Sequence, residues 1–181
     1  MGYDVVRRLE RLPDLTTKDI PLPELSFILT SDLAVLDHSD GTITLIANAI
    51  NWDGSDERID EAYESCVQRL DRMQADLSTP LSGEAAAIPD FSLPDYIGNI
   101  SGEQFKENIL KVKEEILAGE AFQVVLSQRF AMPCQADAID VYRMLRLNNP
   151  SPDMYLFRFT DGIEIVGSSP EALVKVNQKD V

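Results

Sequence analysis

The chain has 181 residues and a formal net charge of −15, with 44% hydrophobic and 26% charged residues. These values are typical of a globular protein with a buried core, and no apolar run is long enough for a membrane helix. The acidic charge repels nucleic acid phosphates and anionic lipids, so we expect neither nucleic acid nor a membrane as a partner.

The first fifty residues predict a short helix, an extended connection and a hairpin. Residues 1–12 show a helical pattern, and residues 13–25, with three prolines, are expected to be extended. Strands are predicted over residues 25–38 and 42–49, because the turn sequence Ser39-Asp40-Gly41 separates two apolar runs. His38, the single histidine, lies beside this turn and is predicted to be a surface residue.

A long amphipathic helix is predicted next, capped by Asp53 or Ser55 and reaching Leu77. Its apolar face includes Cys66, which we expect in the core. Cys66 and Cys134 match no disulfide or metal spacing, so both are predicted to be free thiols in a reducing cytoplasm. Residues 78–100, which are rich in Pro, Gly and Ser, are predicted to connect two domains.

The second half predicts helices that alternate with strands. Ser101 and Gln104 have capping-box spacing for a helix that ends at Gly119. There follow a strand over residues 122–130, a helix capped by Asp137 that ends before Pro150, and a hairpin over 154–159 and 163–166. Residues 167–171 are predicted to form a turn, and residues 173–176 a last strand. Together these elements predict the α+β class.

Most motifs that carry chemistry are absent from the sequence. There is no phosphate loop, dinucleotide glycine pattern or zinc spacing. Ser168 and Ser169 cannot be assigned as nucleophiles, because Glu171 stands where a Gly-x-Ser-x-Gly elbow needs glycine. Polar groups remain on apolar strands, among them Gln123, and Glu171 follows Pro170 in a position where a carboxylate can face a cavity. Spacing alone favours a half-buried sheet with a polar side that faces solvent.

Three long motifs of the second half carry a specific resemblance. Residues 119–130, the Asn-Pro-Ser-Pro run of 149–152 and the Gly-Ser-Ser-Pro-Glu run of 167–171 resemble the chorismate-utilising enzymes in order and spacing, and most nearly the anthranilate synthase component I family. Residues 2–10 and 33–38 resemble a later part of that family's N-terminal domain, so the likeness covers essentially the whole chain.

The resemblance implies a fold of stacked antiparallel sheets, of which this chain is an internal fragment truncated at both ends. Residues 1–90 then form the end of the N-terminal domain, residues 91–100 a connection, and residues 101–181 the first part of the chorismate-binding catalytic domain. It also implies a lyase reaction of tryptophan biosynthesis. Ammonia from a glutamine amidotransferase partner, component II, adds to the chorismate ring, the C4 hydroxyl leaves, and pyruvate is eliminated to give anthranilate.

Site residues are carried over position by position. Glu171 matches the carboxylate near the departing hydroxyl, where a protonated carboxyl can act as general acid. Gln123 stands where relatives that use water as nucleophile carry a lysine base, which favours the amination branch. Ser168 and Ser169 are assigned to the wall of the substrate pocket. The resemblance places a feedback site for tryptophan along one segment, Asn149, Pro150, Ser151, Pro152, Asp153 and Met154, although the family has Tyr at position 153.

The resemblance also implies Mg²⁺ bound to the substrate carboxylate, with ligands that the family carries beyond the position of residue 181. We therefore expect no metal ligand in this chain and no anthranilate synthesis by the chain alone. Two alternatives remain open. One is aminodeoxychorismate synthase component I of folate synthesis, and the other is a non-catalytic module that binds tryptophan.

Overall fold

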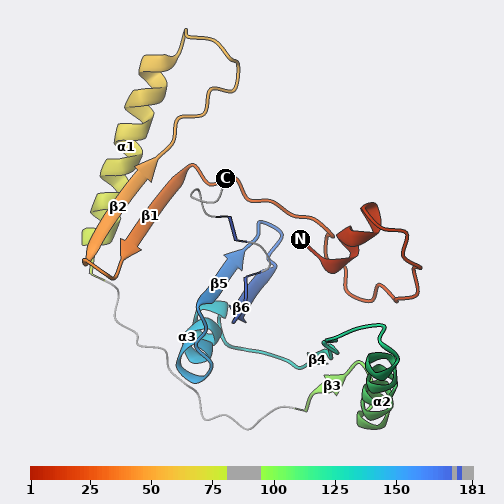
Figure 1. The fold of residues 1–181 in the computed structure, drawn as a ribbon. Coiled ribbons are helices and arrows are strands. Elements are labelled where there is room, and N and C mark those ends of the chain that lie inside the picture. Colours follow the sequence, from red (N-terminus) through yellow and green to blue (C-terminus); the bar gives the residue numbers. More distant parts are fainter. Residues whose placement is uncertain (81–94, 173–174, 177–181) are drawn as a thin grey trace. The chain divides into compact units, whose positions relative to one another are not determined.

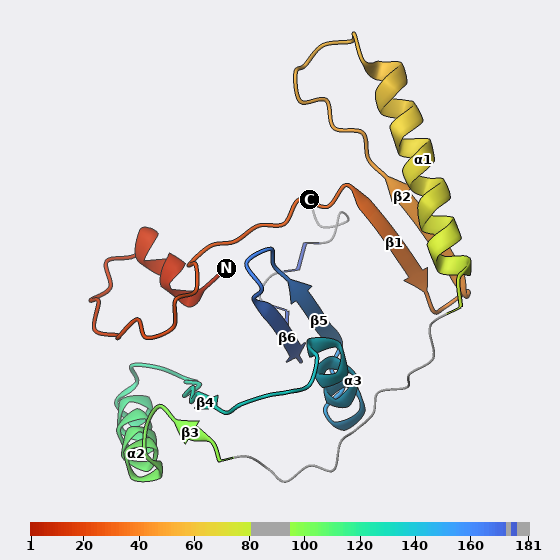
Figure 2. The same ribbon diagram turned by 180° about the vertical axis from the view of Figure 1, so that it is seen from behind.

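The computed structural model describes residues 1–80, 95–172 and 175–176. The chain divides into two compact units, Met1–Gly83 and Glu84–Val181. Figures 1 and 2 show the helices and strands of these units. Both units combine helices with small antiparallel sheets, which confirms the predicted α+β class. No helix in the described ranges is long and apolar enough to cross a membrane. The predicted strand over 173–176 falls partly outside the described residues.

The N-terminal segment is a loop closed by polar contacts rather than the predicted helix over residues 1–12. Only the 3-10 helix η1, Tyr3–Arg8, forms there. The amide of Gly2 donates to the carbonyl of Glu24 at 2.7 Å, and the Lys18 ammonium lies 2.7 Å from the Glu24 carboxylate. The Lys18 hydrogen bond lowers the pKa of Glu24, and Glu24 in turn raises the pKa of Lys18.

The first hairpin pairs β1, Asp32–Asp37, with β2, Thr42–Ala47, in an antiparallel ladder. The predicted first strand over 25–38 was wrong at its start, since residues 25–31 are not in a strand. The apolar sequence of residues 25–31 suits a strand. All six residues of β2 are paired with β1, however, so β2 offers no partner to residues 25–31. A run of suitable side chains forms a strand only where another strand accepts its backbone hydrogen bonds.

The turn of this hairpin follows from its sequence. Gly41 adopts a φ of 73°, in the left-handed region that favours glycine. The Asp37 carboxylate accepts from the Ser39 hydroxyl at 2.7 Å and from its amide at 2.8 Å, and Asp40 accepts from Thr42 in the same way. These donors hold the pKa of both carboxyls below the ordinary value, with the hydroxyl contributing most in each case.

Helix α1, Ile59–Ser78, begins later than predicted. Neither Asp53 nor Ser55 caps it, because the N-cap residue is Arg58 and no side chain bonds the first turn. Asp53 instead accepts from the amide and hydroxyl of Ser55 and pairs with Arg58. These donors, the Ser55 amide first, lower the pKa of Asp53. The carboxylate therefore stabilises the loop before the helix, in competition with capping.

Helix α1 packs on strand β2, and Arg69 fastens it to the open end of the hairpin, where β1 begins and β2 ends. The guanidinium pairs with the Asp32 carboxylate and donates to the carbonyl of Asn48 at 3.0 Å. It also lies 3.1 Å from the sulfur of Cys66, which is 8% exposed and the one buried hydrophobic residue in the described part of the chain. The prediction that Cys66 lies in the core is confirmed, and both cysteines are free.

The second unit opens with a short ladder that the sequence did not predict. Strand β3, Ile97–Gly98, pairs with β4, Phe130–Ala131, and between them lies helix α2, Gly102–Ala118. The caps of α2 are as predicted: the Ser101 hydroxyl accepts from the Gln104 amide at 3.1 Å, and Gly119 ends the helix with a φ of 87°. The predicted strand over 122–130 was wrong, because only its last residue is paired.

The last elements form a hairpin with one helix packed on it. Helix α3, Ala138–Asn148, has Asp137 at its N-cap, as predicted, but no side-chain cap bond. Strand β5, Asp153–Arg158, pairs with β6, Glu164–Ser169, and α3 contacts both strands. Gly162 accommodates the turn with a φ of 83°. The predicted turn over 167–171 was wrong in its first half, because β6 continues through Ser169.

Candidate functional site

The β5–β6 hairpin brings together two motifs that lie apart in the sequence. Its register places Asp153 opposite Ser169 and Met154 opposite Ser168. The end of the Asn149–Met154 segment therefore lies beside the start of the Ser-Ser-Pro-Glu motif. Arg158 pairs with Glu164 at 2.6 Å at the other end of the ladder, next to the turn. A tight turn fixes such a register, so the neighbourhood of the two motifs is a property of the hairpin itself.

Hydroxyl groups join these two motifs through the backbone. The Ser168 hydroxyl donates to the carbonyl of Asn149 at 2.8 Å, so β6 is fastened to the residue that ends α3. The Ser169 hydroxyl donates to the carbonyl of Glu171 at 3.1 Å and shapes the turn that carries this carboxylate. Both serines are half-buried, whereas Pro170 and Glu171 are exposed. The two hydroxyls thus organise the backbone around Glu171.

A close contact between Tyr155 and Gly167 supports the same turn. The two residues are directly opposite in the ladder, and the phenol ring lies over the glycine. A Cβ atom at position 167 would lie 2.5 Å from Cε2 of the ring and closer still to Cζ and Oη. Only glycine leaves this space to the ring. The Tyr155 ring also packs on Phe157, with ring centroids 5.4 Å apart.

Sequence reasoning missed Tyr155, although the signal was present. Counting outward from the turn at Asp161 and Gly162 pairs an aromatic residue with the first glycine of the motif. In a cross-strand pair of an aromatic residue and glycine, the missing glycine side chain leaves room for the ring to lie flat on the sheet.

The segment that carries Gln123 runs beside helix α2 and not within a sheet. Val124, Val125 and Leu126 line a cavity of about 450 Å³ together with the apolar face of α2. Gln123 is exposed. Further along, Gln128 donates to the carbonyl of Ile100 at 3.1 Å, and the Arg129 amide to the side chain of Asn99 at 3.0 Å. The structure therefore joins Ser168, Ser169 and Glu171 to the Asn149–Met154 segment.

The Asn149–Met154 segment is a rigid lead into β5. Asn149 ends α3, Pro150 and Pro152 hold the backbone extended, and the Ser151 hydroxyl donates to the carbonyl of Asp153 at 3.3 Å. The Asp153 side chain is exposed, at the position where the resemblance has Tyr.

The described residues offer no site for a metal ion. Among them, no group of three or more His, Cys, Asp and Glu side chains is placed to hold one. Glu171 is an exposed carboxylate and belongs to no such group in the described region. These residues do not fit a magnesium site, because Mg²⁺ in proteins is bound by several oxygen ligands at once.

Comparison with known proteins identifies the class of protein to which this arrangement belongs. The family of chorismate binding enzymes matches residues 1–181, and the chain belongs to this family. Anthranilate synthase component 1 of Mycolicibacterium smegmatis is 52% identical over 182 residues, which cover 97% of this chain and 34% of that protein. The protein of the same name from Arthrobacter globiformis is 44% identical and covers 100% of this chain and 35% of its own length.

A solved structure agrees with these relatives. The crystal structure of anthranilate synthase component I from Streptococcus pneumoniae matches with a TM-score of 0.78 and 30% identity, over 98% of this chain and 39% of that one. The chain thus spans about a third of the length of the curated relatives it matches. The family inferred from the three motifs is confirmed.

Proposed function

We propose that this chain is part of an anthranilate synthase component I, a lyase that converts chorismate and ammonia to anthranilate and pyruvate in tryptophan biosynthesis. The observation that carries the proposal is the identity of 52% over 97% of the chain with a relative of that name. Chorismate is then the substrate, and a component II subunit with glutamine amidotransferase activity delivers the ammonia. The two free cysteines favour a reducing compartment, the cytoplasm.

Glu171 acts in this proposal as the general acid. The lone pair of ammonia forms the new bond to the ring, the ring double bond shifts, and the C4–O bond breaks as Glu171 gives its proton to the departing hydroxyl. Elimination of pyruvate then gives the aromatic product. The backbone around Glu171 is held by the Ser169 hydroxyl and, one residue earlier on β6, by the bond from Ser168 to Asn149. These contacts support a fixed turn at the wall of the substrate pocket.

Gln123 in this proposal prevents hydrolysis, because it replaces a base that would activate water. An amide side chain cannot accept a proton at neutral pH, so water remains a poor nucleophile and ammonia reacts instead. Mg²⁺, when bound to the substrate carboxylate, would neutralise the negative charge of that carboxylate. Its ligands are proposed to be groups other than the described residues, which do not fit such a site.

A chimera tests the proposal directly. The matched third of the Mycolicibacterium smegmatis relative is replaced by residues 1–181, and anthranilate is followed by its fluorescence with chorismate, ammonia and Mg²⁺. We expect turnover by the chimera and none by the isolated chain. Glu171→Gln should lower kcat by about 10²–10⁴, the range for a lost general acid, whereas Glu120→Gln, an exposed carboxylate outside the site, should leave it unchanged.

Other outcomes would identify the alternatives. A chimera that consumes chorismate and ammonia without releasing pyruvate would be an aminodeoxychorismate synthase. An inactive chimera, together with an isolated chain that releases heat on titration with tryptophan, would indicate a tryptophan-binding module. If residues 149–154 line a tryptophan site, Asp153→Tyr should make the chimera more sensitive to tryptophan, because an aromatic wall replaces a carboxylate.

A further inference from the structure

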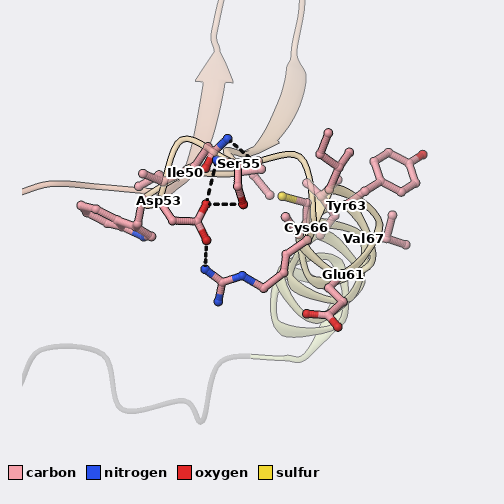
Figure 3. Close-up of a pocket in the computed structure, with 15 residues that line it drawn as sticks. Ile50, Asp53, Ser55, Glu61, Tyr63, Cys66 and Val67 are labelled. Carbon is pink, nitrogen blue, oxygen red and sulfur yellow. Dashed lines mark hydrogen bonds and ion pairs between the residues drawn. The ribbon is translucent and has the colours of Figure 1, made fainter.

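The two units differ in what their local contacts hold in place. In the first unit, Figure 3 shows the Asp53 carboxylate bonded to Ser55 beside a cavity of about 630 Å³, and Asp53 also pairs with Arg58. These contacts stabilise a loop to which the proposed reaction assigns no group. In the second unit, the contacts of three consecutive residues, 167–169, converge on the turn that carries Glu171.

Strand β6 is held on both of its faces just before this turn. Residues that are directly opposite in an antiparallel ladder present their side chains to the same face, and the phenol ring of Tyr155 lies over Gly167 on that face. On the other face, the Ser168 hydroxyl donates to the carbonyl of Asn149 at 2.8 Å. A shift of the strand end toward the ring is therefore opposed twice, by contact with the ring and by loss of the Ser168 hydrogen bond.

The end of β6 is connected to Glu171 by a short and restricted piece of backbone. Ser169 is the last residue of the strand, the ring of Pro170 fixes φ, and the Ser169 hydroxyl donates to the carbonyl of Glu171 at 3.1 Å. The position of the strand end therefore determines where the Glu171 backbone lies. A general acid has to come within about 2.6–3.2 Å of the oxygen that it protonates. A displacement of about 1 Å is enough to lower a rate roughly a hundredfold.

We propose that Tyr155 is a positioning residue for the general acid, and that its ring keeps Glu171 at the departing hydroxyl through Gly167 and the end of β6. This role rests on the proposed function, in which Glu171 is the acid. Tyr155 acts through the backbone and not as a proton donor, so the aromatic ring is required and its hydroxyl is not. Gly167 has the complementary role of leaving space for the ring.

Steady-state kinetics of the chimera with the Mycolicibacterium smegmatis relative test this role. Tyr155→Ala should lower kcat about 10–100-fold, because the acid is displaced from the reacting oxygen. The KM for chorismate should change less than about threefold, because the lost interaction is made in the transition state. Tyr155→Phe keeps the ring and should restore kcat. The matched control is Phe159→Ala, which removes an aromatic ring at the other end of the hairpin and should leave kcat unchanged.

A double-mutant cycle separates positioning from a general loss of structure. If Tyr155 acts through Glu171, Tyr155→Ala should lower kcat less than about twofold further in a Glu171→Gln background, where the acid is already absent. Equal fold losses in the two backgrounds would overturn the proposal. So would full activity of Tyr155→Ala, or a Tyr155→Phe variant as slow as Tyr155→Ala.

NMR of the isolated chain gives a readout that requires no catalysis. The ¹³Cα and ¹³Cβ shifts of Glu171, which report its backbone dihedral angles, should move in Tyr155→Ala and stay at their original values in Tyr155→Phe and Phe159→Ala. Unchanged Glu171 shifts in Tyr155→Ala would refute the positioning role whatever the activity of the chimera. An inactive chimera refutes the proposed function, and the hold of Tyr155 on the Glu171 turn is then decided by these shifts alone.

Discussion

The contact between Tyr155 and Gly167 leads to a sharp prediction for the candidate site. In Gly167→Ala, the added methyl group would lie 2.5 Å from Cε2 of the ring and closer to two other ring atoms. Carbon atoms pack at about 3.5–4.0 Å, so the ring has to withdraw by more than about one ångström. Over-packing of this kind costs about 1–3 kcal/mol. Gly167 does not adopt a positive φ, so alanine also restricts the unfolded chain, which returns about 0.4–1 kcal/mol.

The expected net loss for Gly167→Ala is therefore about 1–2 kcal/mol in the stability of the β5–β6 hairpin. Because the two units need not unfold together, native-state hydrogen exchange of the β5 and β6 amides is the suitable measurement. A double-mutant cycle isolates the contact. In a Tyr155→Ala background the clash is absent, and Gly167→Ala should become neutral or slightly stabilising.

The conservative variant serves as a control. Tyr155→Phe keeps the ring, so Gly167→Ala should still destabilise the hairpin in that background. The reasoning is refuted if Gly167→Ala costs the same with and without the ring at position 155, since the cost would then come from the backbone.

Three further predictions concern the local structure of both units. Arg69→Ala should loosen α1 from the hairpin by about 1–2 kcal/mol, seen as faster amide exchange in α1 and reduced by salt, and an equal effect of Arg72→Ala would contradict this. The lowered pKa of Asp37 stabilises the hairpin turn above about pH 4, and the stability is lost as the pH falls through the lower folded pKa. Carboxyl NMR should show this pKa rising in Ser39→Ala, and an unchanged titration would exclude the bond as its cause. Gly119→Ala should destabilise α2 by about 1 kcal/mol, because its φ of 87° is costly for alanine; unchanged exchange in α2 would count against this.

Local chemistry made the turns and the caps of α2 predictable from sequence. Gly41, Gly119 and Gly162 all adopt positive φ where a turn or a helix end was expected, and Ser101 caps α2 as its spacing indicated. Each of these features depends on residues within a few positions of one another. Asp53 shows the limit of such reasoning, because two local hydrogen-bonding arrangements competed for one carboxylate, and the loop bonds to Ser55 prevailed over the helix cap.

Strand extents were not predictable, because they depend on partners that a single segment does not reveal. Residues 25–31 and 122–129 have the apolar composition of strands, yet neither is in a strand in the structure. For the same reason Gln123 was assigned to a strand face that does not form. The neighbourhood of Ser168 and Asn149 was accessible in principle, since the turn at Gly162 sets the register of the whole hairpin.

The Arg69 fastening has a consequence for biosynthesis. Strand β1, strand β2 and helix α1 follow one another along the chain, and the contact from Arg69 to Asp32 spans 37 residues. These elements all lie within the first unit, so their contacts need no later part of the chain. The hairpin and its helix can therefore assemble while the ribosome is still translating the second unit.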